Sequence, residues 1–223
     1  MPKIHVETPR PQAPLPPHIM ERASKQIRYI AHPLRLSILE FLDLNGPSCV
    51  CAIMDSVGGS QPIVSQSLKR MKKDHVIKGR RDGRFIIYEP AEAYGHSLLT
   101  CMRKRYHIDA GNVNWDNAPP QKLPADFINA VADKMKLVSH VERMRILEYL
   151  FIQGPAFVSD IVEGVKGEQI KVSQNLKRLK NAGLVSCERQ GRFVVYDLAH
   201  DLPKTLLSCI HKRYNALEDK NSF

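Results

Sequence analysis

The heptapeptide VSQSLKR at residues 64–70 returns as VSQNLKR at residues 172–178. Each heptapeptide carries hydroxyl, amide and cationic groups, which are the side chains that hydrogen-bond to base edges and phosphates of DNA. At helical spacing, Val64, Leu68 and Met71 share one side, so the polar side chains point away from it. The polar side chains expected to meet a partner are Ser65, Gln66, Lys69 and Arg70 in the first copy and Ser173, Gln174, Lys177 and Arg178 in the second. The other interpretation is a solvated helix face that happens to be basic.

Basic residues also follow each heptapeptide, where the apolar period changes from 3.6 to 2. The segments HVIKGRRDGRFIIYEP and LVSCERQGRFVVYDL predict two β-hairpins, with turns at residues 82–83 and 190–191. An arginine at a hairpin tip can enter a minor groove or pair with a phosphate. The candidates are Arg81, Arg84, Arg189 and Arg192, and Glu188 replaces Arg80 in the second copy. Alternatively, Arg84 and Arg192 only stabilise the turns.

The heptapeptides belong to a longer internal duplication. A shift of 108 residues aligns residues 32–106 with 140–214 without a gap, and about 32 of 75 pairs are identical. Within each copy, apolar spacing predicts a buried helix around residues 38–42 and a short helix at 49–57, and each copy ends in a helix, near 92–106 and 199–217. The order helix, helix, helix, basic helix, hairpin, helix is that of a winged helix-turn-helix. We therefore predict a mainly α fold with small β-hairpin wings, of class α+β, present as two tandem domains.

Two segments interrupt the periodic blocks. Residues 1–17 contain six prolines, too many for a packed element, and predict a flexible arm. Residues 108–124, IDAGNVNWDNAPPQKLP, mix Gly, Asn and Pro and predict a linker. The expected domains are therefore residues 18–107 and residues 125–223.

Composition limits the function further. The net charge of +10 indicates a polyanionic partner, either nucleic acid or an anionic membrane surface. No apolar run is long enough to span a membrane, and the first residues lack the apolar core of a signal peptide, so we expect a cytoplasmic protein whose five cysteines are mostly reduced thiols. We find no phosphate-binding glycine loop, complete metal motif or nucleophile with its base, which argues against an enzyme.

Three segments resemble one known family. AHPLRLSILEFL, IVSQSLKRMKKDHVIKGRRDGRFIIYEP and KVSQNLKRLKNAGLVSCERQGRFVVYDL resemble the ArsR-type winged-helix repressors of bacteria and archaea. The resemblance covers nearly all of the chain outside the arm and the linker. It implies a transcriptional regulator, of the repressor type, that binds double-stranded DNA in a sequence-specific way. The alternative is a winged-helix scaffold for protein interactions, without DNA binding.

The resemblance also implies how the two copies work together. Family members are usually homodimers of one such domain, so the copies are expected to pack as an intrachain pseudo-dimer in a monomeric chain. The operator should then be an imperfect inverted repeat, because Ser67 and Arg80 are not matched in the second copy.

The segment PSCVCAI, residues 47–53, resembles the Cys-Val-Cys segment that arsenic- and cadmium-sensing members use as thiolate ligands. It implies that Cys49 and Cys51 bind As(III), Cd(II) or a similar soft ion. The second copy has Phe157 and Ser159 there, so the chain holds one such site at most.

Three features weaken the metal interpretation. Met54 stands where the arsenical pattern has a further cysteine, and the arm offers histidines, His5 and His18, where the cadmium pattern has cysteines. Residues two apart on a helix point about 200° apart, so Cys49 and Cys51 can share an ion only where the helix begins or is distorted. The other interpretation is a pair of structural or merely reactive thiols.

The closing helices carry two further candidates. Zinc-sensing relatives place ligands along this helix, but His96 and His107 correspond to Lys204 and Asn215, so we expect no zinc site. Cys101 and Cys209 occupy equivalent positions and are interpreted either as small buried apolar residues or as a thiol switch. Cys187 has no clear role.

Overall fold

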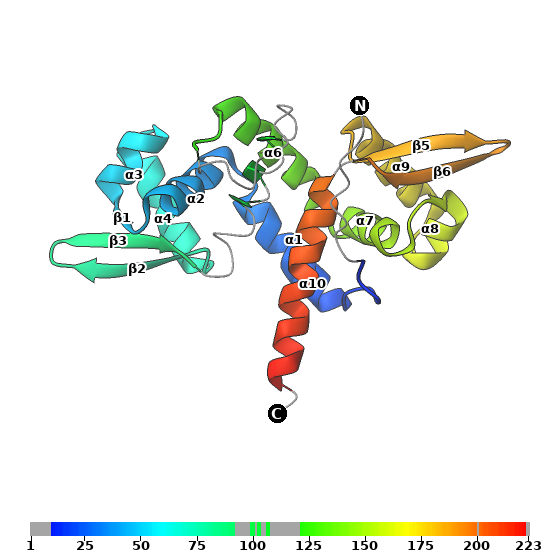
Figure 1. The fold of residues 1–223 in the computed structure, drawn as a ribbon, viewed down its shortest axis with the longest axis horizontal. Helices are drawn as coiled ribbons and strands as arrows, with labels where there is room; N and C mark the ends of the chain where they lie inside the picture. Colours follow the sequence, from blue (N-terminus) through cyan, green and yellow to red (C-terminus); the bar gives the residue numbers. More distant parts are fainter. Residues whose placement is uncertain are drawn as a thin grey trace. The chain divides into compact units, whose positions relative to one another are not determined.

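The structure is a computed structural model that describes residues 10–91, 99–100, 102–103, 106–107, 121–199 and 201–221 of the chain. It is mostly helical, with two three-stranded antiparallel sheets, one in each copy of the repeat (Figure 1). The chain divides into two compact units. No helix in the described residues is long and apolar enough to cross a membrane.

The first copy contains four helices that precede its hairpin. Its elements are α1 (Pro17–Ile30), α2 (Pro33–Asn45), β1 (Ser48–Cys49), α3 (Val50–Val57), α4 (Gln61–Lys73), β2 (Ile77–Asp82) and β3 (Phe85–Pro90). The sheet order is β1-β3-β2. Residues 99–100, 102–103 and 106–107 are helical, as expected for the closing helix of this copy, and the rest of that predicted helix lies outside the described residues.

The second copy repeats this order. Its elements are α6 (Ala125–Val138), α7 (Val141–Gln153), β4 (Ala156–Phe157), α8 (Val158–Gly164), α9 (Gln169–Asn181), β5 (Val185–Gln190), β6 (Phe193–Leu198) and α10 (Asp201–Asn221). From α6 to β6, every boundary lies 108 residues after its counterpart, except that α8 ends one residue early. The predicted fold class, mainly α with two hairpin wings, is confirmed.

The hairpins form within one residue of the predicted turns, because the two-residue turns are residues 83–84 and 191–192 and not 82–83 and 190–191. Asp82 pairs with Phe85 and Gln190 pairs with Phe193, so each strand pair closes over a two-residue turn. Gly83 and Gly191 occupy these turns with φ of 58° and 61°, a left-handed conformation that glycine adopts without steric cost. The third strands, β1 and β4, were not predicted, because two residues are too few to show a period of 2.

The compact units do not coincide with the predicted domain ranges. One unit combines the described parts of residues 26–136, and the other combines those of residues 1–25 with those of 137–223. The end of the arm therefore packs with the second copy, and the end of the linker packs with the first. The domain boundaries at residues 18, 107 and 125 stay a prediction.

A pair of equivalent hydrogen bonds fixes these two segments. The backbone N–H of Leu123 donates to Oε1 of the buried Glu40 over 2.5 Å. The backbone N–H of Leu15 donates to Oε1 of the buried Glu148 over 2.9 Å. Both donors and both acceptors are 108 residues apart, so the same contact occurs once in each unit. The duplication therefore extends upstream to Leu15, and the predicted flexible arm is packed at its end.

Arg35 and Arg143, which occupy equivalent positions in the two copies, each connect two helices. In the first copy, Arg35 Nη1 donates to the carbonyl oxygen of Tyr29, and its guanidinium lies over the Tyr29 ring. In the second copy, Arg143 Nε donates to the carbonyl oxygen of Leu137 over 2.5 Å. Both contacts join a helix to the residue six positions before the arginine, at the end of the preceding helix. This shared contact explains why both copies have an arginine at this position.

Candidate nucleic-acid interface

The basic helices α4 and α9 each bury one face and expose the other. Val64, Leu68 and Met71 are fully buried in α4, and Val172, Leu176 and Leu179 are buried in α9. Each helix packs on the preceding helices of its own copy and on the first strand of its own hairpin. This arrangement leaves the outer face of each helix accessible to a partner.

The predicted contact residues lie on these outer faces. The exposed side chains are Gln66, Lys69, Arg70, Ser173, Gln174, Lys177 and Arg178, and Ser65 is half-buried. The two helices thus present matching hydroxyl, amide, ammonium and guanidinium groups in the same order. Such a set can donate to guanine, exchange a pair of hydrogen bonds with adenine, and bind phosphate.

The last turn of each basic helix adds positive charge. Arg70, Lys72 and Lys73 lie in the last turn of α4, and Arg178 and Lys180 lie in the last turn of α9. Cations at a helix C-terminus are stabilised by the helix dipole, so the charge does not oppose folding. These residues extend the basic surface toward the hairpin.

The hairpin arginines fall into two kinds. Arg81 Nε donates to the Gly83 carbonyl over 3.1 Å, and Arg189 Nε donates to the Gly191 carbonyl over 3.0 Å. Arg81 and Arg189 therefore stabilise the turns, a role that the sequence had suggested for the neighbouring pair, Arg84 and Arg192. All four arginines are exposed, so their remaining N–H groups are accessible.

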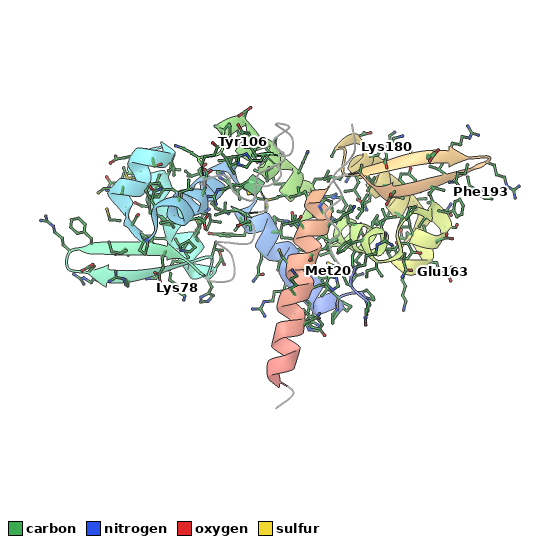
Figure 2. All side chains as sticks on the ribbon, in the orientation of Figure 1. Met20, Lys78, Tyr106, Glu163, Lys180 and Phe193 are labelled. Carbon is green, nitrogen blue, oxygen red and sulfur yellow. The ribbon has the colours of Figure 1, made fainter. Side chains whose placement is uncertain are left out.

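Two phenylalanines at the hairpins were missed by sequence reasoning. The Arg84 guanidinium lies 5.1 Å from the centroid of Phe85, and the Arg192 guanidinium lies 4.9 Å from the centroid of Phe193. Phe85 and Phe193 are 46% and 52% exposed, and Phe193 lies toward the free end of its hairpin (Figure 2). The repeated tripeptide Gly-Arg-Phe was the signal that could have identified them.

Arg80 differs from the other hairpin arginines. It lies 3.7 Å from Asp82 in an exposed ion pair, and the second copy has Glu188 at its position. Exposed pairs of this kind contribute little to stability. The difference makes the first hairpin more basic than the second.

The Cys-Val-Cys segment lies at the start of α3. Cys49 is the N-cap residue, with φ −79° and ψ 166°, and it is half-buried; Cys51 is exposed in the first turn. This non-helical start is the geometry that the sequence required for two thiols to share an ion. However, no group of three or more His, Cys, Asp or Glu side chains suited to a metal occurs in the described ranges. Two thiols alone do not complete a set of three or four soft ligands.

The other cysteines and histidines are spread through the fold. Cys209 is half-buried on α10, and its equivalent Cys101 lies outside the described residues, as does His96. His107 is buried. Cys187 is half-buried on β5, and its sulfur accepts a hydrogen bond from Lys180 that raises the pKa of Lys180.

Comparisons with known proteins identify the family. The profile of the arsR family of bacterial regulatory proteins matches residues 32–78 and again residues 140–186. An HTH-type transcriptional regulator of Methanocaldococcus jannaschii is 37% identical over 68 residues, which cover 30% of this chain and 76% of the relative. In Mycobacterium tuberculosis, the HTH-type transcriptional repressor SmtB is 36% identical over 97 residues, covering 43% of this chain and 71% of SmtB.

A third relative gives the same result. The HTH-type transcriptional regulator NmtR of Mycobacterium tuberculosis is 37% identical over 82 residues, covering 37% of this chain and 68% of NmtR. The family resemblance inferred from the sequence is confirmed, and the scaffold alternative is not favoured. The chain belongs to the ArsR family of regulatory proteins, as a DNA-binding transcription regulator, not an enzyme, that carries the family's helix-turn-helix twice.

Proposed function

We propose that the chain is a repressor that binds operator DNA with α4 and α9 as its recognition helices, each in a major groove. The observation that supports this most is the matched outer face of the two helices, where Ser, Gln, Lys and Arg recur at the same positions. A major groove admits an α-helix, and these side chains match the donors and acceptors of its base edges. We assign the base contacts to Gln66, Lys69, Arg70 and Ser65, and to Gln174, Lys177, Arg178 and Ser173.

The hairpins supply the phosphate contacts in this proposal. Arg84 and Arg192 have no turn carbonyl as a partner among the hydrogen bonds of the described hairpins, so their guanidinium groups can pair with phosphates or enter a minor groove. Arg81 and Arg189 add to this contact from the turns that they stabilise.

One chain would bind both half-sites of an operator, one with each copy of the domain. The duplication repeats nearly every helix and strand boundary, so each copy can present the same surface to one half-site. We expect an inverted repeat with half-sites about one or two helical turns apart. The repeat is imperfect because the first hairpin carries Arg80 where the second carries Glu188.

The difference between Ser67 and Asn175 does not contribute to base reading in this proposal. Asn175 is only 6% exposed, and its side chain is bonded to Glu142. The sequence had suggested this pair as a second cause of the imperfect repeat, but the side chain is turned toward the protein interior.

Selection of duplexes from a random pool, followed by fluorescence anisotropy, tests the proposal. Gln66→Ala and Lys69→Ala should each weaken binding to the selected duplex roughly 5- to 150-fold, which corresponds to about 1–3 kcal/mol for each lost base contact. Lys25→Ala, which removes an exposed lysine of α1, serves as the matched control and should change little.

Salt dependence separates the repressor from a protein-interaction scaffold. Affinity for random duplex DNA should fall steeply as salt rises, because bound Lys and Arg release counterions from the phosphates. Weak binding at every salt concentration would contradict the proposal.

A further inference from the structure

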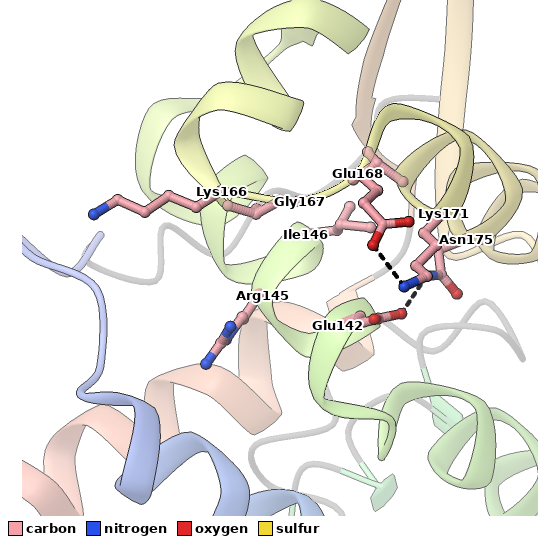
Figure 3. Close-up of a pocket in the computed structure, with 10 residues that line it drawn as sticks. Glu142, Arg145, Ile146, Lys166, Gly167, Glu168, Lys171 and Asn175 are labelled. Carbon is pink, nitrogen blue, oxygen red and sulfur yellow. Dashed lines mark hydrogen bonds and ion pairs between the residues drawn. The ribbon is translucent and has the colours of Figure 1, made fainter.

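The second copy contains a pocket behind its recognition helix. The pocket has a volume of about 100 Å³ and is lined by α7, by the turn between α8 and α9, and by the first turns of α9 (Figure 3). All of its lining residues belong to one compact unit. Any occupant would therefore touch both the helix that reads DNA and the helix that supports it.

The chemistry of this pocket is specific to the second copy. Six of its ten lining positions are charged or polar: Glu142, Arg145, Lys166, Glu168, Lys171 and Asn175. Their counterparts in the first copy are Leu34, Ser37, Gly58, Ser60, Ile63 and Ser67, and no charge occurs at any of the ten matching positions there. The four remaining positions keep an identical residue in both copies, either apolar or glycine. The second copy therefore carries five charged residues around four residues that are identical in both copies.

Part of this charge is satisfied within the pocket. Asn175 Nδ2 donates to Glu142 Oε2 over 3.1 Å, and Lys171 Nζ lies 2.8 Å from Glu168 Oε1. The bond to Glu168 also raises the pKa of Lys171. Both carboxylates therefore have a partner that belongs to α9.

Arg145 and Lys166 supply two further cations to the pocket lining. The side chains of Arg145 and Lys166 make no hydrogen bond or ion pair with any residue in the described ranges; the backbone N–H of Lys166 is bonded to the Glu163 carbonyl. Figure 3 shows both side chains extending from the side of Ile146 that faces away from Glu142 and Glu168. Three cations against two carboxylates give the pocket a charge of +1. A bound monoanion would neutralise it.

The backbone conformation of Lys166 also indicates that its side chain has a role. Lys166 has φ 51°, in the left-handed region that favours glycine, and the first copy has Gly58 with φ 69° at this position. A side chain at such a position costs stability relative to glycine, and residues held in this way cluster at functional sites. The second copy thus keeps a lysine where glycine would fold more easily.

We propose that this pocket binds a small monocarboxylate with a short aliphatic chain, and that the bound anion releases DNA. The planar guanidinium of Arg145 suits a carboxylate, and Lys166 adds a second cationic donor. Ile146 and Val172 line the pocket and offer apolar surface to the aliphatic chain of the ligand. Glu142 and Glu168 would repel a second carboxylate, so dicarboxylates bind less well. The volume is about two-thirds of the 150 Å³ cavity that holds benzene, so the pocket encloses roughly four non-hydrogen atoms and the end of a longer aliphatic chain lies at its open mouth.

The release of DNA rests on the function proposed above. Lys166 is exposed at the turn that precedes α9, where it can also approach a DNA phosphate. A carboxylate bound to Arg145 and Lys166 competes with that phosphate for the same charge. A ligand shifts an equilibrium only by its differential affinity for two states, and this competition supplies the difference.

The first test measures ligand binding to the full chain without DNA. Acetate, butyrate, succinate and inorganic phosphate are titrated calorimetrically against wild type and against Lys166→Gly and Arg145→Ser, which restore the residues of the first copy. Butyrate should bind at one site per chain, more tightly than succinate, and each substitution should weaken it about tenfold or more. Lys25→Ser removes an exposed lysine outside the pocket and should bind butyrate like wild type. Because glycine is the natural residue at position 58, Lys166→Gly should fold at least as well as wild type.

Several results would overturn the inference. These are the absence of saturable butyrate or acetate binding, butyrate binding that neither substitution changes, and tighter binding of succinate or phosphate than of butyrate. A loss of DNA affinity in Lys166→Gly without any butyrate binding would assign these cations to DNA and reject the pocket, while leaving the repressor function intact.

The second test measures DNA release. Butyrate should lower the affinity of wild type for its selected duplex, and Lys166→Gly should be insensitive to it. If butyrate binds but the chain binds no duplex DNA at any salt concentration, the repressor function fails and the ligand site stands on the first test alone. If butyrate binds and the affinity for DNA does not change, the proposal that the bound anion releases DNA is wrong.

Discussion

The segment before the first copy packs on the second copy, and the segment before the second copy packs on the first. We call this arrangement the exchanged packing, and Leu15 and Leu123 allow it to be tested. Leu15 lies just before α1 in the sequence, yet its backbone bonds to Glu148 on α7, and it is 7% exposed. Leu123 lies just before α6, bonds to Glu40 on α2, and is 2% exposed. Replacing either leucine with alanine keeps the backbone hydrogen bond and removes only the buried side chain.

The expected cost follows from burial. Truncating a buried leucine to alanine costs about 2–5 kcal/mol, depending on how far the site collapses. For Leu15, near the chain end and slightly exposed, we expect about 2–3 kcal/mol. Since every 1.4 kcal/mol is a factor of ten, local opening should become roughly 30- to 150-fold more frequent.

Hydrogen exchange measured by mass spectrometry shows where this opening occurs. Leu15→Ala should speed exchange in α7 (Val141–Gln153) and leave α2 (Pro33–Asn45) unchanged, and Leu123→Ala should do the reverse. Gln12→Ala, at an exposed position of the same segment, is the control and should change neither helix. Faster exchange in α2 on Leu15→Ala would refute the exchanged packing, because it would place the arm on its own copy.

Two further predictions concern the buried Glu40 and the cysteine pair Cys49 and Cys51. Burial raises the pKa of the Glu40 carboxyl, so the folded state keeps a proton that the unfolded state has lost, and stability falls as pH rises from the ordinary glutamate pKa of about 4.3 through the raised value. Glu40→Gln still accepts the Leu123 N–H and should lose this dependence, so its melting temperature relative to wild type should rise with pH; a constant difference would contradict this. If Cys49 and Cys51 respond to As(III) or Cd(II), titration should give one equivalent per chain, and the Cys49→Ser, Cys51→Ser double variant should no longer release DNA when the metal is added. Equal release from both proteins, measured by anisotropy, would remove these thiols from the response.

The sequence predicted the two basic helices and the two hairpins well, because each signal occurs twice. Helical spacing placed Val64, Leu68 and Met71 inside, and the change of period placed the hairpin turns within one residue of the observed turns. The exchanged segments were harder to predict. Periodicity reports which face of a helix is buried but not which segment covers it, and α1 and α6 share no identical residue at matching positions.

The buried carboxylates show the same limit. Glu40 and Glu148 are identical in the two copies and lie beside apolar residues, so a buried role could be suspected from the sequence. Their partners are backbone N–H groups of Leu123 and Leu15, and a backbone donor leaves no trace in residue identity. Pairing of this kind becomes visible only in three dimensions.

The one difference between the two heptapeptides has a physical reason in the residues around it. Asn175 is buried, and a buried amide needs a partner, which Glu142 provides. The first copy has Leu34 at the position of Glu142, so an asparagine at position 67 would lose its acceptor there, whereas Ser67 carries a smaller polar group. The two positions therefore differ as a pair, on the inner side of the helix, while the outer side chains of the heptapeptide are the same in both copies. If α4 and α9 bind DNA as proposed, they can read similar bases while different residues hold each helix in its copy, which allows a signal to act on one copy alone.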